Sequence, residues 1–598
     1  MSARPGRLRA VCHGALLAGA LALVACDETP AAPPGGFADT QDATDTTPEP
    51  DTLLVDTVVD TTPSGPVRPE HCTTKLSPGP APLRRLTKTE YDNTVRDLLG
   101  DTSHPGQAFP PEEQTLGFDN NASGRGVAQV HVERYMIAAE NLVRTALAER
   151  REQIIPCDPN DMPALLCARM TFSRFGKLAY RRPLTSEEEA RYEAYFEALL
   201  PTEGFDGAIA MLLEVMLQSP HFLYRTELGE PDTDGDGVSA LTGFELATRI
   251  SYLLWGSMPD DKLLAAAEVG LLATPEGIAT EARRLLKDPK ARDALLHFHR
   301  QWLELPKLET TFKDAEIFPD FAGLKDRFET ETERFIDHVV WDGEGDLTTL
   351  LSASYSILDP VLADFYGATY PATESEGTLP ERRGFTKVDL DPSQRAGLFT
   401  QASIMSTHAK YNQTSPVLRG KFVREQILCQ PLQPPPANIN ITPPDLDPNL
   451  TTRERFRQHS DSDECAGCHK KLDPIGLTFE HYDGNGRWRD AESATLPIDV
   501  TGEILFTWDA NGPVADALEV AHRLAESEQT RECYVTQWFR YAHGRDTGFA
   551  DECNVFDLMQ AFSASNWNIK ELLVALTQTE AFRFRPTVVP GGGVGVGE

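Results

Sequence analysis

The chain of 598 residues contains 91 acidic and 56 basic side chains and carries a formal net charge of −35 at pH 7. This charge argues against a nucleic-acid ligand, because nucleic-acid backbones are bound mainly by clusters of Lys and Arg. The chain is too long for one hydrophobic core, so we expect at least three units of ordinary domain size.

The N-terminus has the pattern of a secretory signal peptide over residues 1–25. Arg4, Arg7 and Arg9 precede a short apolar run, which cannot cross a bilayer as a stable helix. The run ends directly before Cys26, in a string that resembles the lipobox of bacterial lipoproteins, where this cysteine carries the lipid. We therefore expect a lipid anchor on Cys26, in the periplasm or at the outer-membrane surface. Ordinary signal-peptidase cleavage without a lipid is the alternative.

Residues 26–70 are dominated by Asp, Thr, Pro and Ala, with almost no aromatic side chain. Such a segment cannot bury enough apolar surface to fold, and repulsion between its carboxylates extends it. We predict a disordered acidic tether that lifts the folded part away from a membrane. The rest of the sequence contains no stretch with the length and apolarity of a transmembrane helix, so the membrane contact is expected through the lipid.

Helical patterns dominate the folded part. A capping box, Thr followed three residues later by Glu, precedes apolar residues at helical spacing at Thr87, Thr185 and Thr242. Further helical patterns run through residues 276–305 and 320–340. Alternation typical of a strand is confined to the stretch around residues 498–508. The sequence therefore predicts a mainly α protein with several helical domains and short β-hairpins.

An acidic turn follows the N-terminal helices. Asp232, Asp234 and Asp236 match the opening of a calcium-binding loop. The bidentate Glu of such a loop is replaced by Gly243, and Glu245 lies two residues late. Calcium bound by the three aspartates is one interpretation, and an acidic surface turn is the other.

The string Cys-Ala-Gly-Cys-His at residues 465–469 has the spacing used to attach a c-type haem. Cys465 and Cys468 would form thioethers to the two vinyl groups, and His469 would supply the proximal iron ligand. Zinc and thiol redox centres also use a C-x-x-C pair. A zinc ribbon needs a second pair nearby, whereas the next cysteine is Cys533, and the βαβ pattern of a thioredoxin is missing. We therefore expect covalent haem c.

The sequence does not determine which residue is the second axial ligand of this haem. The only Met downstream of the string is Met559, and His459 lies six residues before Cys465. We favour His459 and keep Met559 as the alternative. Other candidates are His408, His481 and His543. An open sixth position is a further possibility, and such an iron binds oxygen, peroxide or another small ligand instead of only transferring electrons.

Arg487, Trp488 and Arg489 follow the string as a compact cluster. Two guanidinium groups can offset the two haem propionates, so we predict that this cluster binds and packs against the haem. A solvated Arg pair beside a core Trp is the alternative.

The chain contains ten cysteines, of which Cys12 lies in the signal peptide. Once the lipid-bearing cysteine and the haem pair are also set aside, six remain, an even number that suits three disulfides in an oxidising compartment. Of the connectivities that six cysteines allow, we favour Cys157–Cys167, Cys533–Cys553 and Cys72–Cys429.

Several long strings resemble a family of exported bacterial proteins. They are LRRLTKTEYDNTVRDLLG at 83–100, FGKLAYRRPLTSEE at 175–188, SPHFLYRTELG at 219–229, LATRISYLLWGSMPDD within 240–264, FHRQWL at 298–303, TSPVLRGKFV within 395–436, CAGCHKKLDPIGLTFEHYDGNGRWRD at 465–490 and CYVTQWFRYAHGRD at 533–546. The family joins domains of unknown function numbered fifteen eighty-seven, fifteen ninety-five, fifteen ninety-two, fifteen eighty-eight and fifteen eighty-five. The resemblance implies a C-terminal half similar to cytochrome c.

Pro-rich segments at residues 231–238, 369–392 and 431–448 are candidate domain boundaries. We expect the signal peptide at 1–25, the tether at 26–70, N-terminal helical domains at 71–230, a central helical domain at 231–368, the haem-binding cytochrome c-like region at 369–500, a C-terminal helical domain at 501–585 and a disordered tail at 586–598.

The sequence thus predicts a membrane-tethered c-type cytochrome that exchanges electrons with a partner protein of unknown identity in the cell envelope. A second hypothesis is an exported haem-dependent redox enzyme, with the helical half binding an organic or polysaccharide substrate. The third is a surface binding module without redox function. Motifs of serine hydrolases, zinc proteases, P-loop proteins and dinucleotide-binding folds are missing from the sequence.

Overall fold

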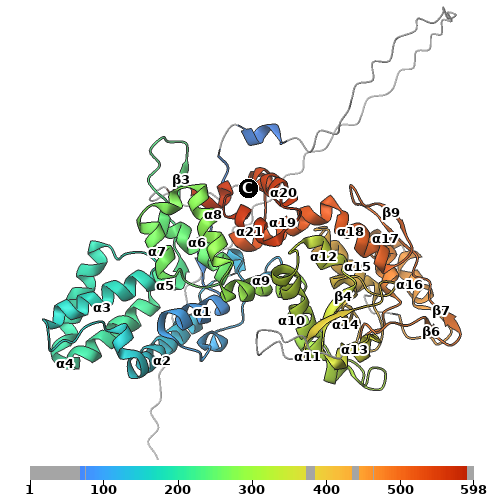
Figure 1. The fold of residues 1–598 in the computed structure, drawn as a ribbon, viewed down its shortest axis with the longest axis horizontal. Coiled ribbons are helices and arrows are strands. Elements are labelled where there is room, and N and C mark those ends of the chain that lie inside the picture. Colours follow the sequence, from blue (N-terminus) through green and yellow to red (C-terminus); the bar gives the residue numbers. More distant parts are fainter. Residues whose placement is uncertain are drawn as a thin grey trace, which may run out of the picture. The chain divides into compact units, whose positions relative to one another are not determined.

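The computed structural model describes residues 68–73, 76–124, 126–371, 384–433, 444–461 and 463–588. The predicted signal peptide, Cys26 and almost all of the predicted tether lie outside the described residues. Helices dominate the described part, and its strands form only two-stranded antiparallel sheets (Figure 1). The prediction of a mainly α protein with short β pairs is confirmed. None of the described helices combines the length and apolarity needed to cross a membrane.

The N-terminal helices pack around buried Phe172, Phe196 and Phe222. The elements are β1 (Arg84–Arg85), α1 (Lys88–Leu99), α2 (Gln129–Ile154), α3 (Ala164–Ala179), α4 (Ser186–Gln218), α5 (Pro220–Leu223) and β2 (Tyr224–Arg225). Strands β1 and β2 pair antiparallel and join the two ends of this region. These helices therefore possess a core of their own.

The central elements follow in chain order. They are β3 (Val238–Ala240), α6 (Gly243–Trp255), α7 (Asp261–Glu268), α8 (Pro275–Leu285), α9 (Pro289–Trp302), α10 (Pro306–Thr310), α11 (Phe321–Asp337), α12 (Leu347–Ser352), β4 (Tyr355–Leu358) and α13 (Pro360–Tyr366). The helical pattern predicted over 276–305 is broken between α8 and α9. Asp288 accepts a hydrogen bond from the backbone N–H of Lys290 at 3.0 Å, and Pro289 occupies the first helical position. An Asp-Pro pair of this kind starts a new helix.

The C-terminal half contains β5 (Thr386–Asp389), α14 (Ala402–Thr407), α15 (Pro416–Phe422), η8 (Val423–Ile427), α16 (Thr452–Asp461), α17 (Asp463–Gly476), β6 (Ala491–Ser493), β7 (Leu496–Pro497), β8 (Gly502–Ile504), β9 (Gly512–Val514), α18 (Ala517–Glu526), α19 (Glu528–His543), α20 (Glu552–Ala564), α21 (Ile569–Leu576), α22 (Glu580–Arg583) and β10 (Phe584–Pro586). One large core joins these elements to the central helices. Phe298 of α9 stacks on Trp538 of α19, with ring centroids 3.6 Å apart. The central and C-terminal parts therefore share their core.

The predicted capping boxes all form. At α1, Thr87 Oγ1 accepts from the backbone N–H of Glu90 at 3.0 Å, and Glu90 Oε2 accepts from the N–H of Thr87 at 2.9 Å. The same reciprocal pair starts α4 at Thr185 and α6 at Thr242. These local signals place three helix starts correctly because a capping box satisfies backbone groups within its own turn.

A buried charge network connects distant parts of the chain. Arg249 of α6 forms a two-point ion pair with Glu227, at 2.8 and 2.6 Å, and also donates to the carbonyls of Ala581 and Phe582. Arg84 lies 3.5 Å from the same carboxylate. Burial raises the pKa of Glu227, but the neighbouring Arg side chains outweigh it and hold the pKa at about 2. The strings that resemble the family therefore include groups that fix the fold.

The chain end returns to the central part, where β10 pairs antiparallel with β3. Thr587 continues this contact, since its hydroxyl donates to Asp232 at 3.1 Å. The described structure thus extends past Arg585, after which the sequence predicted a disordered tail. Residues 589–598 lie outside the described part.

Three disulfides form among the six cysteines assigned to them: Cys157–Cys167, Cys72–Cys553 and Cys429–Cys533. The first pairing is confirmed, whereas the favoured pairings Cys533–Cys553 and Cys72–Cys429 are wrong. Cys533 lies on α19, which packs against η8 just before Cys429, and Cys553 lies on α20 beside the segment around Cys72. The predicted pairing of Cys533 with Cys553 relied on their closeness in sequence, but α19 and α20 bring the two cysteines to different parts of the chain. The disulfides are compatible with a location outside the cytoplasm.

A buried carboxyl group makes stability depend on pH. Glu331 of α11 is fully buried and accepts hydrogen bonds from Ser356 Oγ and Tyr366 Oη, both at 2.7 Å. Burial raises its pKa from the ordinary 4.5 to about 7, although these hydrogen bonds and Arg395 act in the opposite direction. The folded protein therefore binds this proton more tightly than the unfolded chain. The stabilisation is full below about pH 4.5 and is lost as the pH rises to about 7.

Replacing Glu331 by Gln should remove this pH dependence. We expect the free energy of unfolding of the wild type, relative to Glu331→Gln, to fall by on the order of 3 kcal/mol between pH 4.5 and 7.5. Denaturant unfolding of both proteins across this range measures the difference. Glu276→Gln, at an exposed position of α8, is the control and should keep the wild-type slope. Parallel pH profiles for wild type and Glu331→Gln would contradict the raised pKa.

Candidate functional site

The C-x-x-C-H string lies on helix α17. Cys465, Cys468 and His469 are spaced by three and four residues, so one face of the helix carries all three. Cys465 is half-buried and Cys468 is exposed, and both are free thiols. The pair thus forms no disulfide with itself or with the six cysteines of the three described disulfides. Two free thiols next to an imidazole on one face are the donor set that a c-type haem needs.

His469 is held by a carboxylate one turn further along the helix. Its Nδ1 lies 3.0 Å from both carboxylate oxygens of Asp473. The imidazole is 16 % exposed and the carboxylate 6 %. Such a contact fixes the orientation of the ring and leaves Nε2 as the nitrogen that would face a metal. Asp473 was not among the residues predicted for this site, although its spacing of four residues from His469 was a usable signal.

Helix α17 crosses α15 at two glycines. A Cβ placed on Gly420 would lie 2.2 Å from the carbonyl oxygen of Leu472, and one on Gly476 would lie 1.8 Å from that of Pro416. Both distances are far inside van der Waals contact, so the helices approach this closely only because neither position has a side chain. The crossing therefore sets the position of the helix that carries the string.

Two buried arginines hold the chain after the string. Arg419 donates to the carbonyls of Phe479 and Tyr482, each at 2.8 Å. Arg424 donates to the carbonyl of Lys471 at 2.9 Å. Both guanidinium groups are about 1 % exposed. Arg419 lies within TSPVLRGKFV and Arg424 directly after it, but nothing in the sequence indicated a role for either, because their partners are backbone carbonyls some fifty to sixty residues away.

The predicted propionate-binding cluster forms contacts of its own. Arg489 pairs with buried Glu480 at 3.0 Å, and Arg487 lies over the ring of Phe365 with its carbon 4.4 Å from the centroid. Trp488 stacks on His481, with centroids 4.4 Å apart. These contacts anchor the segment after the string, and a role toward haem propionates stays a prediction.

The candidates for the second axial ligand are spread over the fold. His459 lies on α16, but its side chain is outside the described part. Met559 lies on α20, which packs against α19 and α21, whereas α17 packs mainly against α15, α16 and β8. His481 stacks on Trp488, as above. Neither His459 nor Met559 is brought to His469 by a described contact, so both stay predictions.

Two further histidines are buried. His408 packs against Phe422 of α15, with centroids 4.5 Å apart, and burial lowers its pKa to about 3. Its Nε2 has no hydrogen-bond partner in the described part of the structure. His543 is buried on α19 next to Phe539, and burial holds its pKa well below 6.5. Both rings are thus held neutral, the form that binds iron.

The structure brings the carboxylates of Asp232, Asp234 and Asp236 within 4.8 Å of one another. Each accepts hydrogen bonds from backbone N–H groups of the same turn, between Gly235 and Val238. Glu245 caps α6 and accepts from the N–H of Leu228 and Gly229. The late Glu is therefore engaged elsewhere, and calcium at this turn stays a prediction.

Comparison with protein families finds five matches in chain order. They are Protein of unknown function (DUF1587) at residues 84–148, (DUF1595) at 167–227, (DUF1592) at 241–368, (DUF1588) at 395–492 and (DUF1585) at 512–582. The family model matched over 395–492 bears the name PSCyt3, which points to a cytochrome-related domain and covers the C-x-x-C-H string. No curated protein and no solved structure matches the chain.

Proposed function

Since the chain belongs to the family that joins these five domains of unknown function in this order, we propose that it is a c-type cytochrome of the cell envelope. Its haem is attached to Cys465 and Cys468, with His469 as the proximal ligand. Its role is the transfer of single electrons to or from a partner protein. The N-terminal lipid on Cys26 and the acidic tether hold it at a membrane.

One observation carries this proposal: two free thiols and a carboxylate-bound imidazole share one face of α17 within the segment matched by PSCyt3. Haem, when bound, would supply an iron that is reduced and oxidised by one electron. The chain's own residues attach the group, orient its ligand and fix the helix that carries both. Asp473 keeps Nδ1 of His469 occupied, and the glycine crossing with Arg419 and Arg424 holds α17 in place.

The attachment is tested by replacing Cys465 and Cys468 together by Ser. The wild type, produced with a c-type maturation system, should keep haem after denaturation and show a pyridine haemochrome spectrum. The double variant should lose essentially all covalent haem, because both thioether bonds are removed. Haem staining of a denaturing gel and haemochrome absorption measure the result.

Cys157→Ser with Cys167→Ser is the matched control, because it also removes two sulfurs but leaves α17 untouched. This variant should retain the covalent haem of the wild type. Absence of haem from denatured wild-type protein would refute the proposal, and so would equal haem retention in the Cys465→Ser, Cys468→Ser protein.

A haem-dependent enzyme acting on an organic or polysaccharide substrate is the second candidate. It is supported by a cavity far from the string in sequence, lined mainly by residues before position 310. Ligand binding in this cavity can be tested whether or not the protein carries haem.

A further inference from the structure

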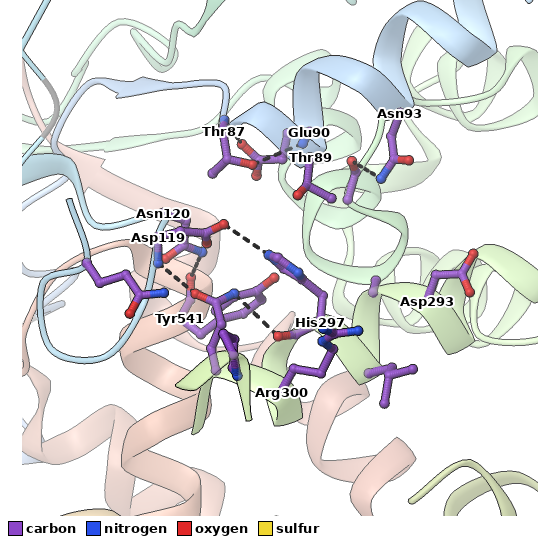
Figure 2. Close-up of a pocket in the computed structure, with 16 residues that line it drawn as sticks. Thr87, Thr89, Glu90, Asn93, Asp119, Asn120, Asp293, His297, Arg300 and Tyr541 are labelled. Carbon is purple, nitrogen blue, oxygen red and sulfur yellow. Dashed lines mark hydrogen bonds and ion pairs between the residues drawn. The ribbon is translucent and has the colours of Figure 1, made fainter. Parts of the chain in front are cut away.

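A cavity of about 390 Å³ lies where the N-terminal, central and C-terminal parts of the described chain meet (Figure 2). Its walls come from the start of α1, the loop that contains Asp119 and Asn120, helix α9 and Tyr541 of α19. This volume is within the range of small-molecule sites. Three of the matched families thus contribute to one cavity, the same one that supports the second candidate function, and the class of its ligand is inferred below on that basis.

The loop that bears Asp119 is fixed on both sides. Phe118 is buried and stacks on Phe298 of α9, with centroids 5.5 Å apart. Asn120 Nδ2 donates to the carbonyl of Tyr541 at 2.8 Å. The backbone N–H of Asp119 donates to Oε1 of Gln301 at 2.7 Å. The polar groups of this loop are therefore held in position before any ligand binds, which lowers the entropic cost of binding.

His297 and Asp119 form a pair at the cavity wall (Figure 2). His297 Nε2 lies 3.1 Å from Asp119 Oδ2, and the side chains are 28 % and 13 % exposed. Burial lowers the pKa of His297, but the Asp119 carboxylate outweighs this and raises it above 6.5. Because Asp119 engages Nε2, Nδ1 is the ring nitrogen that can meet a ligand.

The charges on the wall select against anions. Glu90, Asp119 and Asp293 contribute carboxylates, and Glu90 is itself paired with buried Arg225 at 3.4 Å. Of the basic groups, His297 is paired with Asp119, and Arg300 is engaged by Glu333 at 2.6 Å and Glu329 at 2.5 Å. A phosphate or carboxylate ligand would therefore have to compete with these carboxylates for both basic groups of the wall.

The same wall offers both acceptors and donors for hydrogen bonds. Oδ1 of Asn120, a residue only 5 % exposed, is a buried acceptor without a partner in the described structure. Burial raises the pKa of Tyr541 far above its ordinary value, so its hydroxyl stays protonated. An apolar ligand would leave such groups unsatisfied, at a cost for each. A simple cation could not use the donors, whereas hydroxyl groups both donate and accept.

We propose that this cavity binds a neutral polyhydroxylated molecule, such as a sugar unit, through His297, Asp119 and the amide of Asn120. The site is separate from the haem-binding string in sequence and in its lining residues. It gives the helical half of the chain a ligand-binding role whether or not the protein carries haem.

The test is calorimetric titration of the full chain with neutral sugars: glucose, galactose, mannose, N-acetylglucosamine and short oligomers of each. We expect saturable binding of at least one, and weaker binding of glucuronate than of glucose. Asp119→Asn and His297→Gln should each weaken the binding by at least about tenfold, the effect of losing one hydrogen bond to a charged group. Thr89→Trp places a bulky ring at an exposed lining position and should block the site without removing the pair.

Asp342→Asn is the matched control, since Asp342 faces His338 at 3.6 Å in a similar pair outside the cavity. It should bind sugar as the wild type does. The proposal is overturned if no neutral sugar saturates the protein, if glucuronate binds more tightly than glucose, or if Thr89→Trp binds with wild-type affinity. Haem content does not enter these measurements, so failure here leaves the haem proposal intact.

Discussion

Replacement of Gly476 by Ala is expected to destabilise the protein by about 3 kcal/mol or more and to lower the yield of covalent haem. Gly476 has φ −64° and ψ −33°, a backbone conformation that alanine adopts without strain. The effect therefore comes entirely from the new methyl group, which would lie 1.8 Å from the carbonyl oxygen of Pro416. Helix α17 must move away from α15, and its displacement weakens the hydrogen bond from Arg424 to Lys471.

Gly467→Ala is the control for this substitution. Gly467 lies on the same helix, and a Cβ there would meet nothing within 4 Å. Because alanine favours helix over glycine by about 1 kcal/mol, this variant should be neutral or slightly more stable. The midpoint of thermal unfolding and the haem retained after denaturation are measured for both variants. Equal stability of Gly476→Ala and Gly467→Ala would show that the crossing tolerates a side chain.

Local features of this fold were predictable from sequence. The capping boxes at Thr87, Thr185 and Thr242 begin helices because their hydrogen bonds close within four residues. The spacing of the C-x-x-C-H string places its thiols and its imidazole on one face of α17 because the segment is helical in the structure. The Asp288-Pro289 pair was also a local signal, for the start of a new helix, but the helical periodicity on both sides of it suggested one continuous helix.

Features that depend on contacts distant in sequence were not predictable. Pairing of Cys72 with Cys553 spans 481 residues, and nothing near either cysteine in sequence indicates the other. The same holds for Gly420 and Gly476 at the helix crossing. In the sequence they are ordinary helical positions, and only the structure shows that the backbone of the partner helix lies against them. The cavity lined by Asp119 and His297 combines segments from three domains, so neither residue stood out in the sequence.

In the haem-loaded protein, replacement of Asp473 by Asn is expected to raise the reduction potential by about 60–120 mV. With His469 as the proposed iron ligand, the carboxylate at 3.0 Å from Nδ1 would give the imidazole more negative character and so would favour ferric over ferrous iron. Asparagine keeps a hydrogen-bond acceptor but loses the charge. Loss of such a partner typically changes a metal equilibrium by 10- to 100-fold, and each tenfold change corresponds to about 59 mV for one electron. Spectroelectrochemical titration measures the shift.

The matched control removes a charge that does not contact the imidazole. Glu503 is exposed on β8, a strand that packs against α17, so Glu503→Gln also removes one negative charge near this helix. Water screens that exposed carboxylate, and its loss should shift the potential far less than the loss of Asp473. Equal shifts would contradict the prediction, because the contact of Asp473 with the imidazole would then add nothing to the effect of a screened surface charge. A larger shift in Asp473→Asn, with unchanged covalent haem content, would identify Asp473 as the residue that positions His469 and sets the potential of the iron.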